Sequence, residues 1–161
     1  MELSGRGLEV LSRNVRIAVL NGPNLNLLGV REPEIYGSQT LSDLERLVSE
    51  RAADLGVEVD WFQTNHEGEF LERVHSLRDS VDGAIVNPAA WTHSSLAIRD
   101  AFLGVQTPFV EVHLSNIYAR EPERRKSVLS DLAIGSIVGF GAGGYLMALD
   151  ALAGYLNDEK A

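Results

Sequence analysis

The chain has 161 residues, of which 45% are hydrophobic and 23% are charged, so it is long enough to bury the core of one soluble domain. Its formal net charge of −9 argues against a nucleic-acid partner, which needs a basic surface, and no apolar run could span a membrane. Because the sequence contains no cysteine, disulfides, thiolate catalysis and cysteine metal sites are excluded. We expect a cytoplasmic protein in which residues 1–14 form a loose polar extension without signal-peptide features.

The first predicted element is a buried strand over 15–20, which contains the apolar run 17–20, and an unusually long loop follows it. No helical period appears between Asn21 and Thr40, and a loop of that length in a compact domain is uncommon and usually functional. The loop carries Arg31 and Tyr36. We interpret it as the mobile wall of an active site, with nearby glycines as hinges.

A helix and an edge strand are predicted next. Thr40 is followed three residues later by Asp43, a capping-box pattern, and the apolar face that follows ends at Gly56. Residues 57–62 alternate between apolar and acidic side chains, which is typical of an edge strand with one wet face. A second helix is predicted over the segment that carries Phe70, Leu71, Val74 and Leu77.

The second half of the chain continues the alternation of strands and helices. Strands are predicted at 83–86, at 108–112 running on to residue 114, and at 136–140. Between the first two of these lies a helix over 94–102, capped by Ser94 or Ser95. An arginine-rich segment occupies 120–126, and a final amphipathic helix runs from about Tyr145 to Leu156.

The alternation predicts a single α/β domain with a parallel sheet and helices on both faces. Five strands favour the flavodoxin-like doubly wound order 2-1-3-4-5, in which ligands bind beyond the carboxyl ends of the strands at the switch point. Polar residues gather at those predicted ends, as such a site requires. They are Asn21, Asn24, Asn87, Glu111, His113 and Ser115.

Glu111, His113 and Ser115 alternate along one predicted strand, so their side chains share a face. A carboxylate beside an imidazole can orient it as a general acid. One alternative is that they are ordinary strand-end polar groups. Another is a metal site with His93 as third ligand, although no helical pair of histidines supports it.

Arg31 and Tyr36 suggest a base, and the arginine-rich segment suggests a substrate clamp. A tyrosine loses its proton near pH 10 on its own, and a neighbouring guanidinium favours the phenolate, which could abstract a proton from carbon beside a carbonyl. The alternative is a surface tyrosine and a solvated arginine. Arg120 and Arg124 are likewise either a solvated face or a clamp for a polyhydroxy acid.

Two cofactor-binding alternatives are also weighed. The glycine-rich stretch 139–144 matches a dinucleotide fingerprint, but it lies in the last strand–helix unit, where close helix–sheet packing is the better interpretation. A flavodoxin-like FMN-binding electron carrier would need a Ser/Thr-rich phosphate loop after the first strand, and Asn21–Asn24 is a poor version of one.

Four motifs in order resemble the type II 3-dehydroquinate dehydratase family, over about residues 15–156. The motifs are Asn-Gly-Pro-Asn-Leu-Asn-Leu-Leu-Gly through Tyr36-Gly37, Gln63–Gly68, Asn87–His93 and Glu111–Asn116. The resemblance implies a single catalytic domain over 15–157 that dehydrates 3-dehydroquinate to 3-dehydroshikimate, in the shikimate pathway of aromatic amino acid biosynthesis or in quinate breakdown. It further implies no metal or organic cofactor and a homo-oligomer, a dodecamer built as a tetramer of trimers.

The resemblance also implies roles in a stepwise anti elimination through an enolate. Tyr36 would be the base that removes the C2 proton, assisted by Arg31. Asn24 would hold a water that stabilises the enolate oxygen. His113, oriented by Glu111, would protonate the departing C1 hydroxyl.

The remaining residues that the resemblance implicates would bind the substrate. Those that would contact its carboxylate and hydroxyls are Asn87, His93, Leu114, Ser115 and Arg124. Arg120 would belong to the lid with Arg31, and Asp100 would reach a neighbouring subunit's site. Trp91 and the residues around Arg124 depart from the family pattern, so we expect activity with altered affinity.

Overall fold

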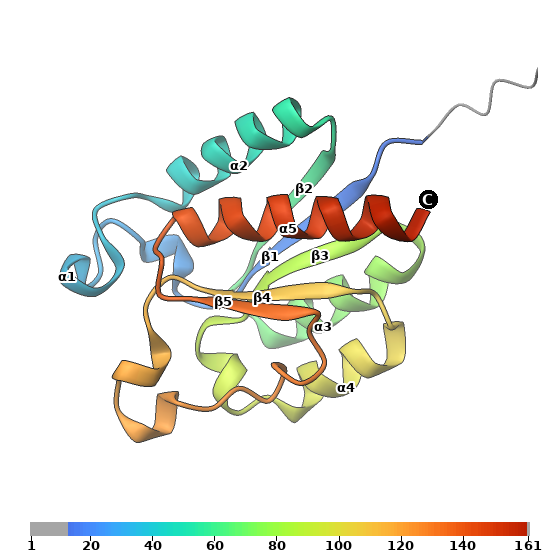
Figure 1. The fold of residues 1–161 in the computed structure, drawn as a ribbon. Helices are drawn as coiled ribbons and strands as arrows, with labels where there is room; N and C mark the ends of the chain where they lie inside the picture. Colours follow the sequence, from blue (N-terminus) through green and yellow to red (C-terminus); the bar gives the residue numbers. More distant parts are fainter. Residues whose placement is uncertain (1–12, 161) are drawn as a thin grey trace, which may run out of the picture.

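The computed structural model describes residues 13–160, apart from the side chains of Tyr36 and Lys160, and Figure 1 shows their fold. A five-stranded parallel sheet runs in the order β2-β1-β3-β4-β5. Its strands are β1 (Arg16–Asn21), β2 (Glu58–Gln63), β3 (Gly83–Asn87), β4 (Phe109–His113) and β5 (Gly135–Val138). The predicted doubly wound α/β fold and its strand order are confirmed.

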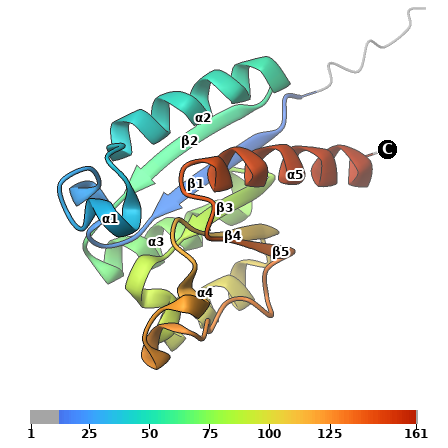
Figure 2. The same ribbon diagram turned by 60° about the vertical axis from the view of Figure 1, so that its left-hand side comes forward.

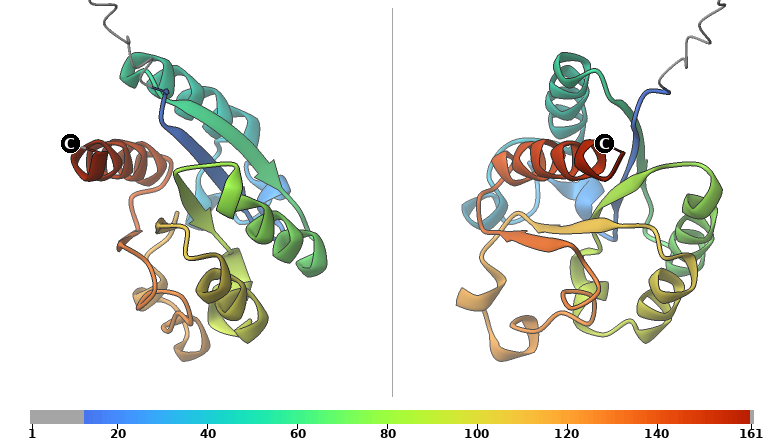
Figure 3. Two further views of the ribbon diagram at one scale, coloured as in Figure 1. Left: turned by 90° about the vertical axis from the view of Figure 1, so that its right-hand side faces the viewer. Right: turned by 45° about the vertical axis from the view of Figure 1, so that its right-hand side comes forward.

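Helices cover both faces of the sheet (Figures 2 and 3). The helices that do so are α2 (Leu41–Leu55), α3 (Glu67–Ser76), α4 (Leu96–Val105) and α5 (Gly143–Lys160), whereas the short helix α1 (Pro33–Tyr36) lies in the loop after β1. Ile17 and Val19 of β1 pack in one core with α2 and α5, whereas Ala18 and Leu20 pack in the other with α3 and α4. This alternation explains why the central strands read as continuous apolar runs.

The helix caps follow the sequence signals. The Thr40 amide donates to Asp43 Oδ2 at 2.9 Å and the Asp43 amide donates to Thr40 Oγ1 at 3.1 Å, which completes the capping box of α2. At the start of α4, the Ile98 amide donates to Ser95 Oγ at 3.1 Å, so Ser95 rather than Ser94 is the cap.

The long loop after β1 contains more regular structure than predicted. It includes a 3-10 turn over Leu25–Leu27 and the short helix α1, which begins at Pro33. Proline is favoured in the first helical turn because its backbone angle is preset and its missing N–H is not needed there. A helix of four residues is too short to show a 3.6-residue period, so the sequence pattern could not reveal it.

Two strands end earlier than predicted. β4 ends at His113, and β5 covers Gly135–Val138 instead of 136–140. Gly139 has a φ of 95°, which takes the backbone out of the extended conformation immediately after Val138. The chain then turns directly into α5.

The predicted extension 1–14 falls almost wholly outside the described residues. Arg13, within the described part, already contacts the domain, because its Nη2 donates to Asp82 Oδ1 at 3.1 Å. Within residues 13–160, no helix is both long and apolar enough to cross a bilayer.

Candidate active site

A cavity of about 710 Å³, including its open mouth, lies beyond the carboxyl ends of β1, β3 and β4. The switch point of the sheet is here, because β1 pairs with both β2 and β3 and Asn21 is level with Asn87. Helix α1 and the turns after β4 lie beyond this same edge in Figure 2. Most predicted site residues line the cavity: Asn24, Arg31, Asn87, His93, His113, Leu114, Ser115, Arg120 and Arg124.

Three predicted residues are not among those lining the cavity. Glu111 is buried behind His113, with 1% of its surface exposed. Asp100 is exposed on α4, so the structure of this single chain does not bring it to the cavity. The backbone of Tyr36 ends α1, but its side chain lies outside the described part of the structure.

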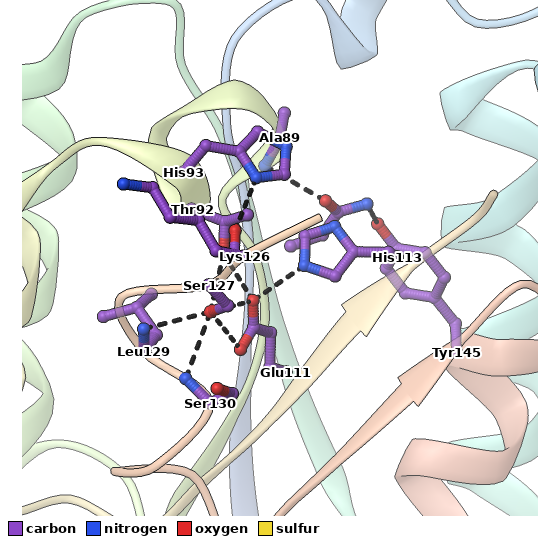
Figure 4. Close-up of polar contacts among 11 residues, drawn as sticks. Ala89, Thr92, His93, Glu111, His113, Lys126, Ser127, Leu129, Ser130 and Tyr145 are labelled. Carbon is purple, nitrogen blue, oxygen red and sulfur yellow. Dashed lines mark hydrogen bonds and ion pairs between the residues drawn. The ribbon is translucent and has the colours of Figure 1, made fainter. Parts of the chain in front are cut away.

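The predicted Glu111–His113 pair is formed in the structure (Figure 4). His113 Nε2 lies 2.7 Å from Glu111 Oε1, and both residues point toward the α3–α4 side because they alternate with Val112 along β4. In Figure 4 the second ring nitrogen, Nδ1, points away from Glu111. A protonated His113 can therefore donate one proton to Glu111 and hold the other for a ligand in the cavity.

Further hydrogen bonds act on Glu111. Thr92 Oγ1 donates to its Oε1, and Ser127 Oγ lies 2.8 and 2.9 Å from its two oxygens. Burial alone would raise the pKa of the Glu111 carboxyl, but the hydrogen bonds from His113 and Thr92 outweigh it and hold that pKa below its ordinary value. Glu111 is thus an oriented anion at neutral pH.

His93 lies beside this pair. Its ring stacks near that of His113, with centroids 6.4 Å apart and planes 18° from parallel, and its Nδ1 lies 2.7 Å from the Lys126 carbonyl oxygen. Burial is the main cause that lowers the pKa of His93, with the neighbouring positive charge of Arg124 contributing. Because a carbonyl only accepts, the neutral ring carries its proton on Nδ1 and leaves Nε2 as an acceptor.

Asn87 is held by a buried network at the floor of the cavity. Its Nδ2 donates to Tyr145 Oη at 2.8 Å, that hydroxyl donates to Asn21 Oδ1 at 2.7 Å, and the Ala89 amide donates to Asn87 Oδ1 at 3.1 Å. Burial raises the pKa of Tyr145, so the phenol keeps the proton it donates. The network determines which way the Asn87 amide faces.

Replacing Tyr145 with phenylalanine should lower the free energy of unfolding by about 1–3 kcal/mol, because the change removes the buried hydrogen bonds that the hydroxyl makes to Asn21 Oδ1 and Asn87 Nδ2. Urea unfolding at a fixed protein concentration measures the loss. Tyr155→Phe, at a partly exposed tyrosine of α5, is the control and should change the value by less than about 0.5 kcal/mol. Equal midpoints for the two variants would contradict the network.

The start of the long loop is held rigidly at the cavity wall. Asn24 adopts a left-handed backbone with a φ of 66°, and its amide donates to Asn65 Oδ1 at 2.9 Å. Gly22 lies so close to the next motif that a Cβ there would be 2.4 Å from the Pro88 carbonyl oxygen. The motifs around residues 21–24, 63–68 and 87–93 therefore meet at one place.

Three arginines give the cavity a positive wall in an acidic chain. Arg31, Arg120 and Arg124 all line it. Arg124 Nε donates to Glu121 Oε1 at 2.5 Å, and Arg31 Nη2 lies 3.3 Å from Glu32 Oε2. Guanidinium groups suit a carboxylate ligand because they offer several donors in a plane.

The metal-site alternative lacks support. Among residues 13–160, no group of three or more His, Asp or Glu side chains is arranged to hold an ion. His113 Nε2 instead faces Glu111, at 2.7 Å from its Oε1.

Sequence reasoning did not identify Thr92, Ser127 or Tyr145 as site residues. Thr92 lies inside the predicted motif 87–93, and Ser127 comes directly after the arginine-rich segment, so their positions were a signal. Tyr145 is predicted only as the start of the last amphipathic helix. Its hydroxyl partners are 58 and 124 residues away in the chain, which no local pattern reports.

Comparison with known proteins identifies the family. Residues 15–153 match the sequence model of the family described as "Dehydroquinase class II". A 3-dehydroquinate dehydratase from Synechococcus sp. (strain WH7803) is 54% identical over 147 residues, covering 91% of this chain and 100% of the relative. A catabolic 3-dehydroquinase from Emericella nidulans is 55% identical over 137 residues, covering 85% of this chain and 90% of that protein.

Solved structures agree with these sequence matches. The type II dehydroquinase from Propionibacterium acnes superimposes with a TM-score of 0.84 at 43% identity, covering 88% of this chain and 99% of that one. The type II dehydroquinase from Butyrivibrio crossotus DSM 2876 also gives a TM-score of 0.84, at 42% identity, with 86% and 97% covered.

Proposed function

The chain belongs to the dehydroquinase class II family, and from this premise we propose that its cavity dehydrates 3-dehydroquinate to 3-dehydroshikimate. The relatives are named 3-dehydroquinate dehydratases, and a dehydratase is a hydro-lyase, the enzyme class of this chain. The observation that carries the assignment to this cavity is the buried Glu111–His113 pair facing a cavity lined by three arginines. An acid beside a positive wall suits the loss of a hydroxyl group from a carboxylate-bearing ring.

We propose a stepwise anti elimination through an enolate. Tyr36, as the phenolate, takes the proton from C2, and the electron pair moves onto the C3 carbonyl oxygen. A water held by Asn24 stabilises the resulting enolate oxygen. When the carbonyl re-forms, the C1–oxygen bond breaks and His113 protonates the departing hydroxyl, which leaves as water.

The geometry supports the acid half of this proposal in particular. Because His113 Nε2 is engaged by Glu111, Nδ1 is the nitrogen that can deliver the proton. Asn24 lies on the cavity wall at the rigid start of the loop, as a water-holding residue should. The role of Tyr36 rests on the family pattern and on its place at the end of α1.

Substrate binding is assigned to the remaining residues of the wall. Asn87 and His93 offer fixed donors and acceptors for hydroxyls, supported by their contacts with Tyr145 and Lys126. The carboxylate and further hydroxyls would be bound by Leu114, Ser115 and Arg124, with Arg120 joining Arg31 on the lid.

The alternative of an FMN-binding electron carrier on the same fold is not favoured. The family match covers residues 15–153, and the relatives cited above are named as dehydratases or dehydroquinases. The loop after β1 runs through Pro23 and Asn24, not through the run of serine and threonine that cradles a flavin phosphate.

Assembly into a dodecamer, with Asp100 reaching a neighbouring subunit's site, stays a prediction drawn from the family resemblance. Asp100 is exposed on α4, where a second subunit could contact it.

The proposed function predicts that purified protein mixed with 3-dehydroquinate generates the ultraviolet absorbance of a conjugated enone. EDTA should not reduce the rate, because the proposed base and acid are side chains. Borohydride added with substrate should trap no adduct, since the proposal contains no imine. Absence of an absorbance change at saturating substrate would contradict the assignment, and a sample without enzyme is the control.

A further inference from the structure

Two hydroxyl groups from distant segments meet at Glu111 (Figure 4). Thr92 belongs to the 3-10 turn Ala89–His93 after β3, whereas Ser127 follows the turn Pro122–Arg124. Thr92 Oγ1 donates to Glu111 Oε1, and Ser127 Oγ lies 2.8 Å from that oxygen and 2.9 Å from Oε2. Thr92 and Ser127 have no part in the proposed function so far: neither is the proposed base, the proposed acid or one of the three arginines that line the cavity.

The hydrogen-bond partners determine which way these hydroxyls point. Ser127 Oγ accepts from the amides of Leu129 at 3.0 Å and Ser130 at 3.1 Å, so its lone pairs are occupied and its single proton is left for Glu111. Thr92 is fully buried, which keeps bulk water away from its hydroxyl. Glu111 therefore lies within hydrogen-bond distance of two hydroxyl donors and of His113 Nε2, a set of partners that suits an ionised carboxylate, which only accepts.

We infer that Thr92 and Ser127 are positioning residues of the proposed proton donor. They hold Glu111 as an oriented anion, and Glu111 in turn keeps His113 with Nε2 engaged and Nδ1 turned to the cavity. This inference rests on the proposed function. The proton donor is then a unit of four side chains: Thr92 from the turn after β3, Glu111 and His113 from β4, and Ser127 from the segment after Arg124.

Ser127 also ties the acid to the arginine wall. The segment 120–127 carries Arg120 and Arg124 at the cavity, the Lys126 carbonyl against His93, and then the Ser127 hydroxyl against Glu111. A displacement of this segment therefore moves the substrate-binding arginines and loosens the acid together.

The charged and titratable groups around Glu111 come from each neighbouring element. His113 contacts it from the same strand, β4, His93 lies beside His113 from the turn after β3, and Arg124 of the segment 120–127 adds a positive charge that acts on His93. Neither hydroxyl titrates near neutral pH, so removing one acts on Glu111 through the lost hydrogen bond and not through a lost charge. Losing a donor disfavours the anion, and the pKa of Glu111 must rise.

A matched pair of variants at Thr92 separates positioning from packing. Thr92→Val keeps the shape and removes the hydroxyl, whereas Thr92→Ser keeps the hydroxyl and removes a methyl group. We expect kcat for 3-dehydroquinate to fall at least about tenfold in the valine variant with KM within about threefold, as for the loss of a hydrogen bond to a charged group. The serine variant should retain most of kcat.

Ser127→Ala should lower kcat as Thr92→Val does, although it also frees the Leu129 and Ser130 amides. Ser130→Ala is its control, because the Ser130 side chain is exposed and only its amide contacts Ser127. Should one variant fail to fold, as judged by circular dichroism, the other carries the test. A purely structural role predicts the reverse order at Thr92, with serine, which leaves a cavity, worse than valine.

A second measurement does not depend on activity. In protein labelled with ¹³C at the glutamate carboxyls, the Glu111 resonance, assigned by its loss in Glu111→Gln, should titrate at a higher pH in Thr92→Val and Ser127→Ala than in the wild type. Thr92→Ser should titrate like the wild type. An inactive wild type would overturn the proposed function. If the wild type is active but Thr92→Val and Thr92→Ser have the same kcat and the same Glu111 titration, the positioning role is overturned.

Discussion

Replacing His113 with glutamine should lower kcat for 3-dehydroquinate by about 10²–10⁴-fold, the range expected when a general acid is lost. The glutamine amide can still donate to Glu111 from about the position of the imidazole Nε2, but it has no proton to give to the departing hydroxyl. KM should change much less than kcat, because the arginine wall is untouched. Steady-state kinetics followed by enone absorbance measures both constants.

The control for this substitution is His75→Gln, at an exposed histidine of α3 away from the cavity. It should leave kcat unchanged within about twofold, because surface substitutions away from functional features have small effects. If His113→Gln turned over substrate at the rate of the control, the acid would have to be sought elsewhere on the wall. Isothermal titration with a non-reacting substrate analogue would show whether the variant still binds.

Replacing Tyr36 with phenylalanine is the second substitution with a large expected effect. It removes the proposed base while keeping the ring, so kcat should fall by about 10²–10⁴-fold and affinity for a non-reacting analogue should stay within about threefold. Rapid mixing with substrate should show no enone burst. Tyr155→Phe, at a tyrosine of α5 outside the cavity, is the matched control.

The outcome of Tyr36→Phe also tests the function of the loop. Helix α1, which Tyr36 ends, lies between Gly29 and Gly37, and both glycines have positive φ angles, at 87° and 82°. If these are the hinges, loop closure carries Arg31 and Tyr36 in together. Loss of analogue binding along with turnover would mean that Tyr36 holds the loop in place and is not the base.

The order of elements and the location of the cavity could be predicted from local pattern. Short apolar runs marked β1 and β3, apolar residues on either side of Glu111 marked β4, and the Thr40–Asp43 pair marked the start of α2. Alternation of strands and helices restricts the topology, because parallel strands need crossovers of one hand. The carboxyl ends of parallel strands meet at one edge, so Asn87, Glu111 and His113 could be placed together from the sequence.

The ends of strands and helices were harder to predict where they depend on the backbone angle of a single residue. The end of β5 depends on the positive φ of Gly139, and α1 is a single helical turn whose start depends on Pro33. Neither feature leaves a periodic signal, because periodicity needs several repeats to be recognised.

The sequence by itself determined which segments form the sheet and most of the side chains that line the cavity at its carboxyl edge. Only the tertiary structure decided how those side chains are held. Thr92 and Ser127 lie 19 and 16 residues from Glu111, and Tyr145 lies 58 residues from Asn87, yet each pair shares a hydrogen bond. Periodicity and caps report interactions within a few residues. The direction of a buried hydroxyl or amide instead depends on partners that only the packed elements bring within about 3 Å.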